Sequence, residues 1–262
     1  MIRRIDIQDI KDFIICPRMF WLKKEHKVSE KLFSSINEKY IVQLRKTIYF
    51  LFSQIQQYDY ADLKRIKRRW ADLWICKGAI SKEQLFLPNV NDTHGWKKKR
   101  SQDGMDILYR VWDKYGDPKY IDRWEIVVVN IPYEIHIDDD IIIVGKLPII
   151  RMDDNSNINI LDFRLCDEYF STKDDIEISL ISLGYRKYSS QIEKNFTVYS
   201  IDKKRERSTR RGPMDHQIAV DTCNEVVIAI NNGINYRRLS RQCEACPYYF
   251  VCRDNGEEET DE

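Results

Sequence analysis

The sequence contains no apolar run approaching the ~18 residues that a membrane-spanning helix needs. Its first residues, Met1–Asp6, lack the apolar region of a secretory signal peptide. We therefore expect a protein of a reducing cytoplasm, of a cell or of a virus-infected host, with no membrane partner. Unpaired cysteines in that compartment stay as thiols, which favours metal ligation over disulfide formation.

The chain also lacks an excess of charge of either sign and any internal repeat. Its net charge is +1 over 262 residues, a length that can bury a sizeable core, as one large domain or as a core with an inserted lobe. The charges are instead gathered locally, which usually marks solvated faces but also suits a track for a phosphate backbone. The basic runs are Lys64–Arg69, Lys97–Arg100, Lys203–Arg211 and Arg237–Arg238, and the acidic tail is Glu257–Glu262.

Three of the seven cysteines fall within ten residues near the end of the sequence. Cys243, Cys246 and Cys252 follow the spacing C-x2-C-x5-C, which offers three thiolates in one short loop and turn. A closed metal or cluster site needs four ligands, and the fourth candidate is Cys16, in the apolar and aromatic helical segment Phe13–Trp21. Spacing alone leaves zinc and an iron–sulfur cluster equally open.

The remaining cysteines are each isolated among apolar neighbours. Cysteine in such a setting behaves as a small hydrophobe, so we expect core positions for Cys76, Cys166 and Cys223. If Cys16 joins the C-terminal trio, the metal centre fastens the two ends of the chain to each other.

Hydrophobic periodicity predicts helices first and a sheet afterwards, and antiparallel hairpins flanked by helices predict an α+β fold. The expected helices span about 8–24, 29–57, 60–75, 174–188 and 215–231, with further helix starts at Ser81 and at Asp103 or Asp106. The expected strands span 124–130, 133–138, 141–152, 158–165 and 195–202. The expected segments are an N-terminal helix (1–28), a helical lobe (29–120), a core (121–232), a cysteine-bearing segment (233–256) and the acidic tail (257–262).

The order of these features resembles the iron–sulfur members of the PD-(D/E)XK nuclease superfamily, namely the CRISPR-associated exonucleases and the nuclease domains of the AddB and RecB type. The matching features are Cys16–Arg18, the hairpin strand that includes Gly145, the Asp162–Arg164 motif and the C-terminal cysteines. The resemblance implies a restriction-endonuclease-like core with a mixed central sheet. It also implies a 4Fe-4S cluster, rather than zinc, held by Cys16, Cys243, Cys246 and Cys252.

In that family, carboxylates on adjacent strands bind Mg²⁺ or Mn²⁺, and a lysine stabilises the developing charge. Here Pro148 stands where a metal-binding aspartate is expected, and Arg164 replaces the lysine after Asp162. Asn37 takes the place of a helical histidine, and Glu177 is the nearest match on the next helix. We therefore expect no Mg²⁺ or Mn²⁺ at this site, where Arg164 could still contact a phosphate but, with a pKa above ~12, could not act as a base.

These features lead to the interpretation of a catalytically inactive nuclease fold with a structural cluster. Such a protein binds DNA, as a single strand or at an end, or docks on a replication, recombination or CRISPR-like assembly. Two alternatives remain: an active Mg²⁺- or Mn²⁺-dependent exonuclease in which Glu134, Asp138 or Glu177 joins Asp162, and an interaction or inhibitory subunit without DNA binding. The simplest structural interpretation of Asp162 is a polar strand residue paired with Arg164 or Lys146.

Overall fold

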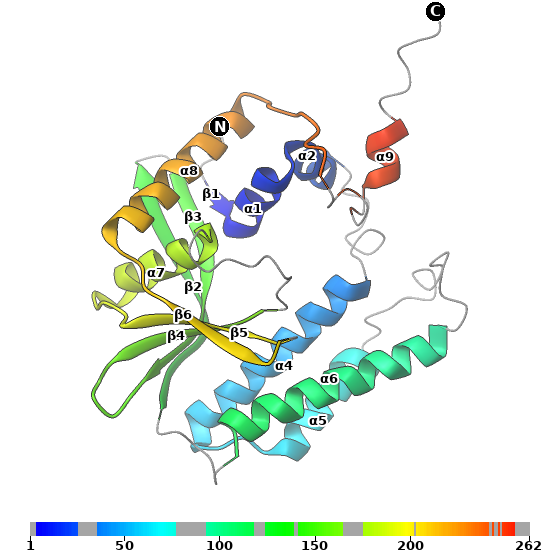
Figure 1. The fold of residues 1–262 in the computed structure, drawn as a ribbon, viewed down its shortest axis with the longest axis vertical. Helices are drawn as coiled ribbons and strands as arrows, with labels where there is room; N and C mark the ends of the chain where they lie inside the picture. The colour runs from blue at the N-terminus through cyan, green and yellow to red at the C-terminus, as the bar shows by residue number, and fades with distance from the viewer. Residues whose placement is uncertain are drawn as a thin grey trace, which may run out of the picture. The chain divides into compact units, whose positions relative to one another are not determined.

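Figure 1 shows the fold in a computed structural model, which describes residues 4–25, 36–76, 93–117, 124–138, 141–164, 175–201, 203–240, 243, 246 and 248–254. The fold is α+β, with a mixed, partly parallel sheet flanked by helices, as the sequence predicts. The chain divides into two compact units. Unit 1 comprises Met1–Ser35, Glu134–Gly145 and Pro213–Glu262, and unit 2 comprises Ile36–Tyr133 and Lys146–Gly212.

The N-terminal segment forms two helices, α1 (Ile7–Ile15) and α2 (Pro17–Glu25), so the prediction of a single helix over 8–24 is wrong. Cys16 separates them in an extended conformation, with φ −161° and ψ 111°. The ring of a proline disfavours helical geometry at the preceding residue, whereas proline itself is well tolerated at the first position of a helix. The break therefore places Cys16 at a junction between two helices.

The six strands belong to one sheet with the order β1-β3-β4-β5-β6, and β2 pairs with β3. The pairs β1·β3 and β4·β5 are parallel, and β3·β4 and β5·β6 are antiparallel. The strands are β1 (Arg4–Asp6), β2 (Glu125–Asp138), β3 (Ile141–Met152), β4 (Ile158–Arg164), β5 (Asn195–Ser200) and β6 (Arg205–Thr209). The predicted interruption between 130 and 133 is absent, and β6 was missed because its residues were interpreted as part of a basic run.

Strand β4 is buried along its whole length. Successive side chains of a strand point to opposite faces, so Asp162 and Arg164 share one face and Leu161 and Phe163 share the other. Both polar residues are 5–6% exposed, although the charged form of such side chains is costly to bury without a partner. This strand therefore needs a compensating polar environment on one of its two faces.

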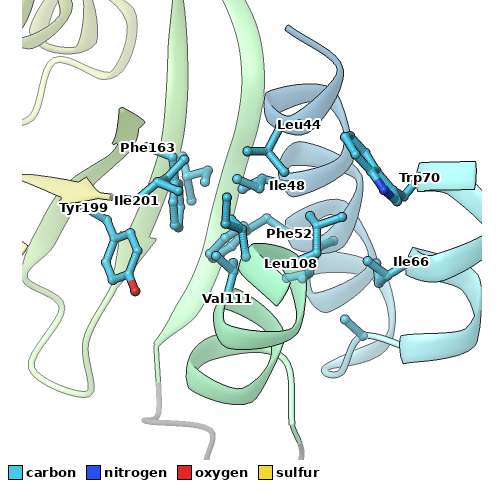
Figure 2. Packing of buried hydrophobic residues seen from close by; sticks show 14 of the residues in the cluster. Leu44, Ile48, Phe52, Ile66, Trp70, Leu108, Val111, Phe163, Tyr199 and Ile201 are labelled. Atoms are coloured by element: carbon cyan, nitrogen blue, oxygen red, sulfur yellow. The ribbon is translucent and has the colours of Figure 1, made fainter. Parts of the chain in front are cut away.

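The helical part of unit 2 packs on the face that carries Leu161 and Phe163 (Figure 2). It consists of α4 (Ile36–Tyr58), α5 (Leu63–Ala71), a π-helical turn (Asp72–Cys76) and α6 (Thr93–Tyr115). Trp70 is buried in this core, and its Nε1 donates a hydrogen bond to the carbonyl of Ser101 at 3.1 Å. The predicted helix starts at Asp103 or Asp106 are wrong, because α6 continues through both positions. Ser81 lies outside the described residues.

We expect Gly104→Ala to destabilise the protein by about 1–3 kcal/mol. A Cβ at Gly104 would lie 2.3 Å from the ring of Trp70, which is fixed in the core. The better helix propensity of alanine recovers only about 1 kcal/mol of this cost. Urea unfolding measures the difference, and the exposed Gln102→Ala on the same helix is the control, with an expected effect within about 0.5 kcal/mol. A Gly104→Ala protein as stable as the wild type would contradict the close packing of α6 on α5.

Three further helices complete the fold: α7 (Ile176–Ser189), α8 (Pro213–Asn231) and α9 (Tyr249–Asp254). Helices α7 and α8 lie where they are predicted, and Gly233 follows α8 with a φ of 69°, typical of a helix C-terminus. Helix α9 was not predicted. Cys223 is fully buried on α8, as expected, whereas the side chains of Cys76 and Cys166 lie outside the described residues. No helix in the described ranges has an apolar stretch long enough to span a bilayer.

Candidate functional site

Four thiols line one cavity of about 200 Å³ in unit 1. Cys16 lies between α1 and α2, Cys243 and Cys246 lie in the segment between α8 and α9, and Cys252 lies on α9. All four are free thiols. The structure therefore brings Cys16 to the C-terminal cysteines across more than two hundred residues of sequence.

The electrostatics of the thiols are consistent with this arrangement. Burial raises the pKa of Cys246, and the nearby thiols of Cys16, Cys243 and Cys252 raise it further because neighbouring negative charges repel one another. Within the described part of the chain, however, no three His, Cys, Asp or Glu side chains form a group that could hold a metal ion. The four thiols thus surround a shared space without converging on one point.

Side chains of two kinds complete the wall of this cavity. One part is apolar and includes Ile15, Met19 and Leu22 from the two N-terminal helices, and the other is cationic and includes Arg237 and Arg253. An apolar wall limits access of water, and cationic groups favour the thiolate over the thiol. The cavity therefore combines four thiols with an apolar wall and cationic side chains.

Hydrogen bonds hold Cys16 beside the C-terminal segment independently of the thiols. They run from Trp21 Nε1 to the carbonyl of Ile234 (2.8 Å), from the amide of Arg18 to the carbonyl of Tyr236 (3.1 Å), and from Arg238 Nη1 to the carbonyl of Ile14 (2.6 Å). Arg238 also offers its own carbonyl to Cys243 Sγ, at 3.8 Å. The segment 234–238 is therefore tied to both helices that flank Cys16.

A chain of backbone turns orders the three C-terminal cysteines. The amide of Cys246 donates to the carbonyl of Cys243 at 3.1 Å, and the amide of Tyr249 donates to the carbonyl of Cys246 at 3.1 Å. The amide of Cys252 then donates to the carbonyl of Tyr248 at 2.8 Å, in the first turn of α9. Cys252 thus projects from a helix, although the sequence predicted a loop and turn for all three.

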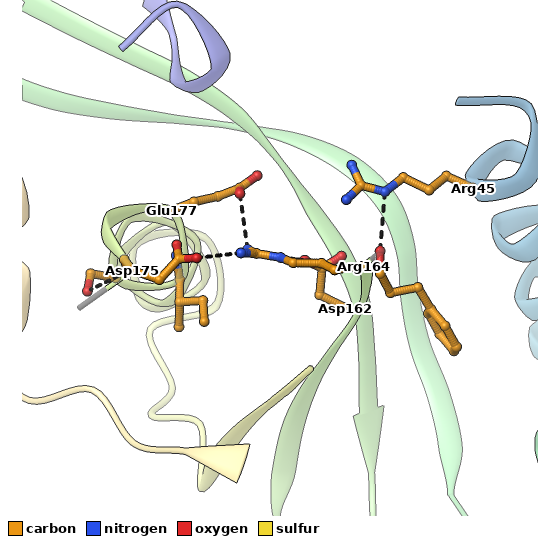
Figure 3. A network of polar contacts seen from close by, with 8 residues as sticks. Arg45, Asp162, Arg164, Asp175 and Glu177 are labelled. Carbon is orange, nitrogen blue, oxygen red and sulfur yellow. Dashed lines mark hydrogen bonds and ion pairs between the residues drawn. The ribbon is translucent and has the colours of Figure 1, made fainter. Parts of the chain in front are cut away.

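A second cluster lies in unit 2, where three carboxylates surround the guanidinium of Arg164 (Figure 3). Arg164 Nε donates to Asp162 Oδ2 at 2.6 Å, and Nη1 donates to Asp175 Oδ2 at 2.6 Å. Its Nη2 lies 3.1 Å from Glu177 Oε2. Asp175 also caps α7 by accepting a hydrogen bond from the amide of Ile178. The start of α7 therefore supplies two of the three anions.

The carboxylates more than compensate for the burial of Arg164. Burial disfavours its charge, but Asp162, Glu177 and Asp175 together raise the pKa of Arg164 above its ordinary value, so it stays protonated. The side chain is 6% exposed and engaged with groups of its own unit. In the structure the guanidinium of Arg164 therefore contacts carboxylates of its own unit. A contact between Arg164 and a phosphate stays a prediction.

Helix α4 adds two residues beside this cluster. Arg45 Nε donates to the carbonyl of Phe163 at 3.2 Å (Figure 3). Burial raises the pKa of Tyr49, and the nearby charge of Asp162 raises it further. Sequence reasoning missed Arg45 and Tyr49, which follow the spacing of one helix turn. At the acidic start of α7 it identified Glu177 but not Asp175. The side chain of Asn37 lies outside the described residues.

The other positions considered for catalysis have separate roles or lie outside the description. Glu134 forms an exposed ion pair with Arg4, at 2.6 Å in unit 1. Pro148 is buried within β3, and Lys146 is exposed on the same strand and is not the partner of Asp162. The side chain of Asp138 lies outside the described residues. Of the alternative carboxylates whose side chains the structure describes, Glu134 and Glu177, it is Glu177 that lies in the same cluster as Asp162.

No protein-family model and no curated protein matches this chain. Among solved structures, the chain is similar to SSO0001, with 11% sequence identity and a TM-score of 0.44. The alignment covers 97% of this chain and 87% of that chain.

Proposed function

We propose that this protein is a nuclease-like iron–sulfur protein that binds DNA without cutting it. The observation that carries the proposal is the buried ion-pair network of Arg164. In the superfamily that the sequence resembles, the carboxylate that Asp162 matches helps to bind a divalent cation, which needs several free oxygen ligands. Here an internal cation, the guanidinium of Arg164, pairs with Asp162 and also with Asp175 and Glu177.

The guanidinium of Arg164 gives a physical reason why this site would not hydrolyse DNA. A bound Mg²⁺ or Mn²⁺ polarises the phosphate and generates hydroxide, and a guanidinium can do neither. A metal ion that entered the site would have to displace Arg164, which would then remain buried and unpaired. Breaking a buried ion pair in this way costs about 3–5 kcal/mol. Metal binding at Asp162 is therefore disfavoured by the fold itself, in addition to the missing aspartate at Pro148.

The grouping of four thiols in one cavity supports a bound cluster of several iron and sulfide ions. A single zinc ion draws four thiolates to within about 2.3 Å of one point, whereas these four thiols line a shared space without converging on one point. The ligands would be Cys16, Cys243, Cys246 and Cys252. When bound, the cluster would supply a structural crosslink between the N-terminal helices and the C-terminal segment.

A digestion assay tests the absence of catalysis. We expect anaerobically purified protein to leave labelled single-stranded DNA intact in Mn²⁺, at rates several orders of magnitude below those of an active nuclease, because metal and charge stabilisation each supply several kcal/mol. Asp162→Ala is the matched variant, with the same background expected. DNA turnover that Asp162→Ala abolishes would contradict the proposal and would favour an active exonuclease.

A further inference from the structure

Helix α5 presents an unusual concentration of positive charge. Five of its nine residues are basic and none is acidic, the five being Lys64, Arg65, Lys67, Arg68 and Arg69. The apolar side of this helix is formed by Ile66 and Trp70, which are buried in the core of unit 2. The basic side chains of Lys64, Arg65, Lys67 and Arg68 therefore point outward, and all four are exposed to solvent.

Among the described residues, no carboxylate pairs with these charges. Over the described ranges, no ion pair within 4.0 Å involves a basic residue of α5, whereas Lys114 is paired with Glu206 at 2.8 Å. Arg65 instead lies over the ring of Tyr58, with 5.8 Å between the guanidinium carbon and the ring centroid. A guanidinium beside a ring still presents its N–H donors in its own plane, where two of them can contact two oxygens of a phosphate.

Exposed aromatic rings lie next to this basic helix. Tyr58 at the end of α4 and Tyr60 in the turn before α5 are 46% and 49% exposed. Proteins that bind single strands combine a positive surface for the backbone with aromatic rings on which the bases stack. A duplex hides the faces of its bases, so exposed rings beside basic residues favour a single strand.

A second basic run lies on the helix that packs against α5. Trp74 Nε1 donates to the carbonyl of Lys97 at 3.4 Å, and Trp70 fixes the next turn of α6 through Ser101. Lys98 and Lys99 in this run are exposed. Tertiary packing thus brings the runs at 64–69 and 97–100 into one lobe of unit 2.

From this arrangement we propose that α5, with Tyr58 and Tyr60, is the surface that binds single-stranded nucleic acid. The backbone phosphates contact Lys64, Arg65, Lys67 and Arg68, and bases stack on the two tyrosines. This inference rests on the proposed DNA binding and assigns it to a surface that does not include the ion-paired residues Asp162 and Arg164.

Binding of a fluorescent single-stranded DNA oligonucleotide, followed by anisotropy across a salt titration, tests the assignment. The variant replaces Lys64, Arg65, Lys67 and Arg68 with glutamine, which preserves helix propensity. We expect its affinity to fall at least tenfold. We also expect the slope of log K against log salt to become shallower by about 0.7 for each phosphate that is no longer neutralised, or by about 3 in total. The matched control replaces Lys203, Lys204, Arg205 and Arg207 on the β5–β6 hairpin with glutamine, so that net charge is the same and affinity should fall much less.

The tyrosines give an independent readout of the same surface. We expect Tyr58→Ser with Tyr60→Ser to weaken binding of single-stranded DNA several-fold and to leave the salt slope unchanged, because stacking involves no counterion release. Equal losses for the α5 variant and the hairpin control would overturn the assignment while leaving DNA binding intact. Wild-type protein that fails to bind DNA would overturn the proposed DNA binding as well. Binding of phosphatidylserine vesicles in place of DNA, abolished in the α5 variant, would identify α5 as a membrane-facing surface and overturn the inference.

Discussion

Cys16→Ala is expected to remove the iron–sulfur cluster and to leave a protein that proteases degrade readily. Cys16 is the ligand farthest in sequence from the others, and its thiol contributes one wall of the shared cavity. A metal centre that forms only in the folded state contributes its binding free energy to folding, so its loss destabilises unit 1 directly. Iron and acid-labile sulfide content, visible absorbance and limited proteolysis of anaerobically purified protein measure the effect.

Cys223→Ala is the matched control for this experiment. Cys223 is fully buried on α8 in the same unit and does not line the cysteine cavity. Its replacement removes one sulfur atom from the core, so we expect modest destabilisation, a brown colour and unchanged iron content. Two results would contradict the cluster: wild-type protein that is colourless and carries stoichiometric zinc, or a Cys16→Ala variant that retains its iron.

Arg164→Met is expected to lower the free energy of unfolding by about 3–5 kcal/mol. The substitution keeps an apolar stem of similar length but removes the cation between Asp162, Asp175 and Glu177. These carboxylates are then left close together in a buried setting, where desolvation and mutual repulsion both oppose their charges. Denaturant unfolding of the cluster-loaded protein, followed by circular dichroism, measures the loss.

Two further variants separate burial from charge in this network. Arg4→Met removes an ion pair of the same short length, but its partners Arg4 and Glu134 are 59% and 41% exposed, and we expect a cost below about 1 kcal/mol. Adding Asp162→Asn to Arg164→Met removes one uncompensated charge and should recover part of the loss. If Arg164→Met costs no more than Arg4→Met, the network contributes little to the fold and would not oppose entry of a metal ion.

The sequence alone was sufficient for features that depend on neighbours along the chain. The cysteine spacing identified three of the thiols that line the cavity, the need for a fourth ligand pointed to Cys16, and strand-like runs between turn residues located β3, β4 and β5. The acidic start of α7 and the glycine after α8 marked both helices correctly, because caps act through the nearest backbone groups. The absence of an aspartate at Pro148 was likewise visible from the order of residues.

The tertiary structure decided which side chains meet. Asp162 and Arg164 are local neighbours, but Asp175 and Glu177 reach Arg164 from a separate helix, and a basic residue in a strand gives no local sign of where its partners lie. The sequence likewise did not reveal that α6 is continuous. Glycine disfavours a helix interior, but at position 104 the ring of Trp70 leaves no space for a larger residue. Pro17 is a local reason for the helix to end at Cys16. Only the tertiary structure shows that the segment 234–238 packs beside Cys16. Local propensity therefore determined the elements, and long-range packing and electrostatics determined how arginine, carboxylates and thiols are grouped.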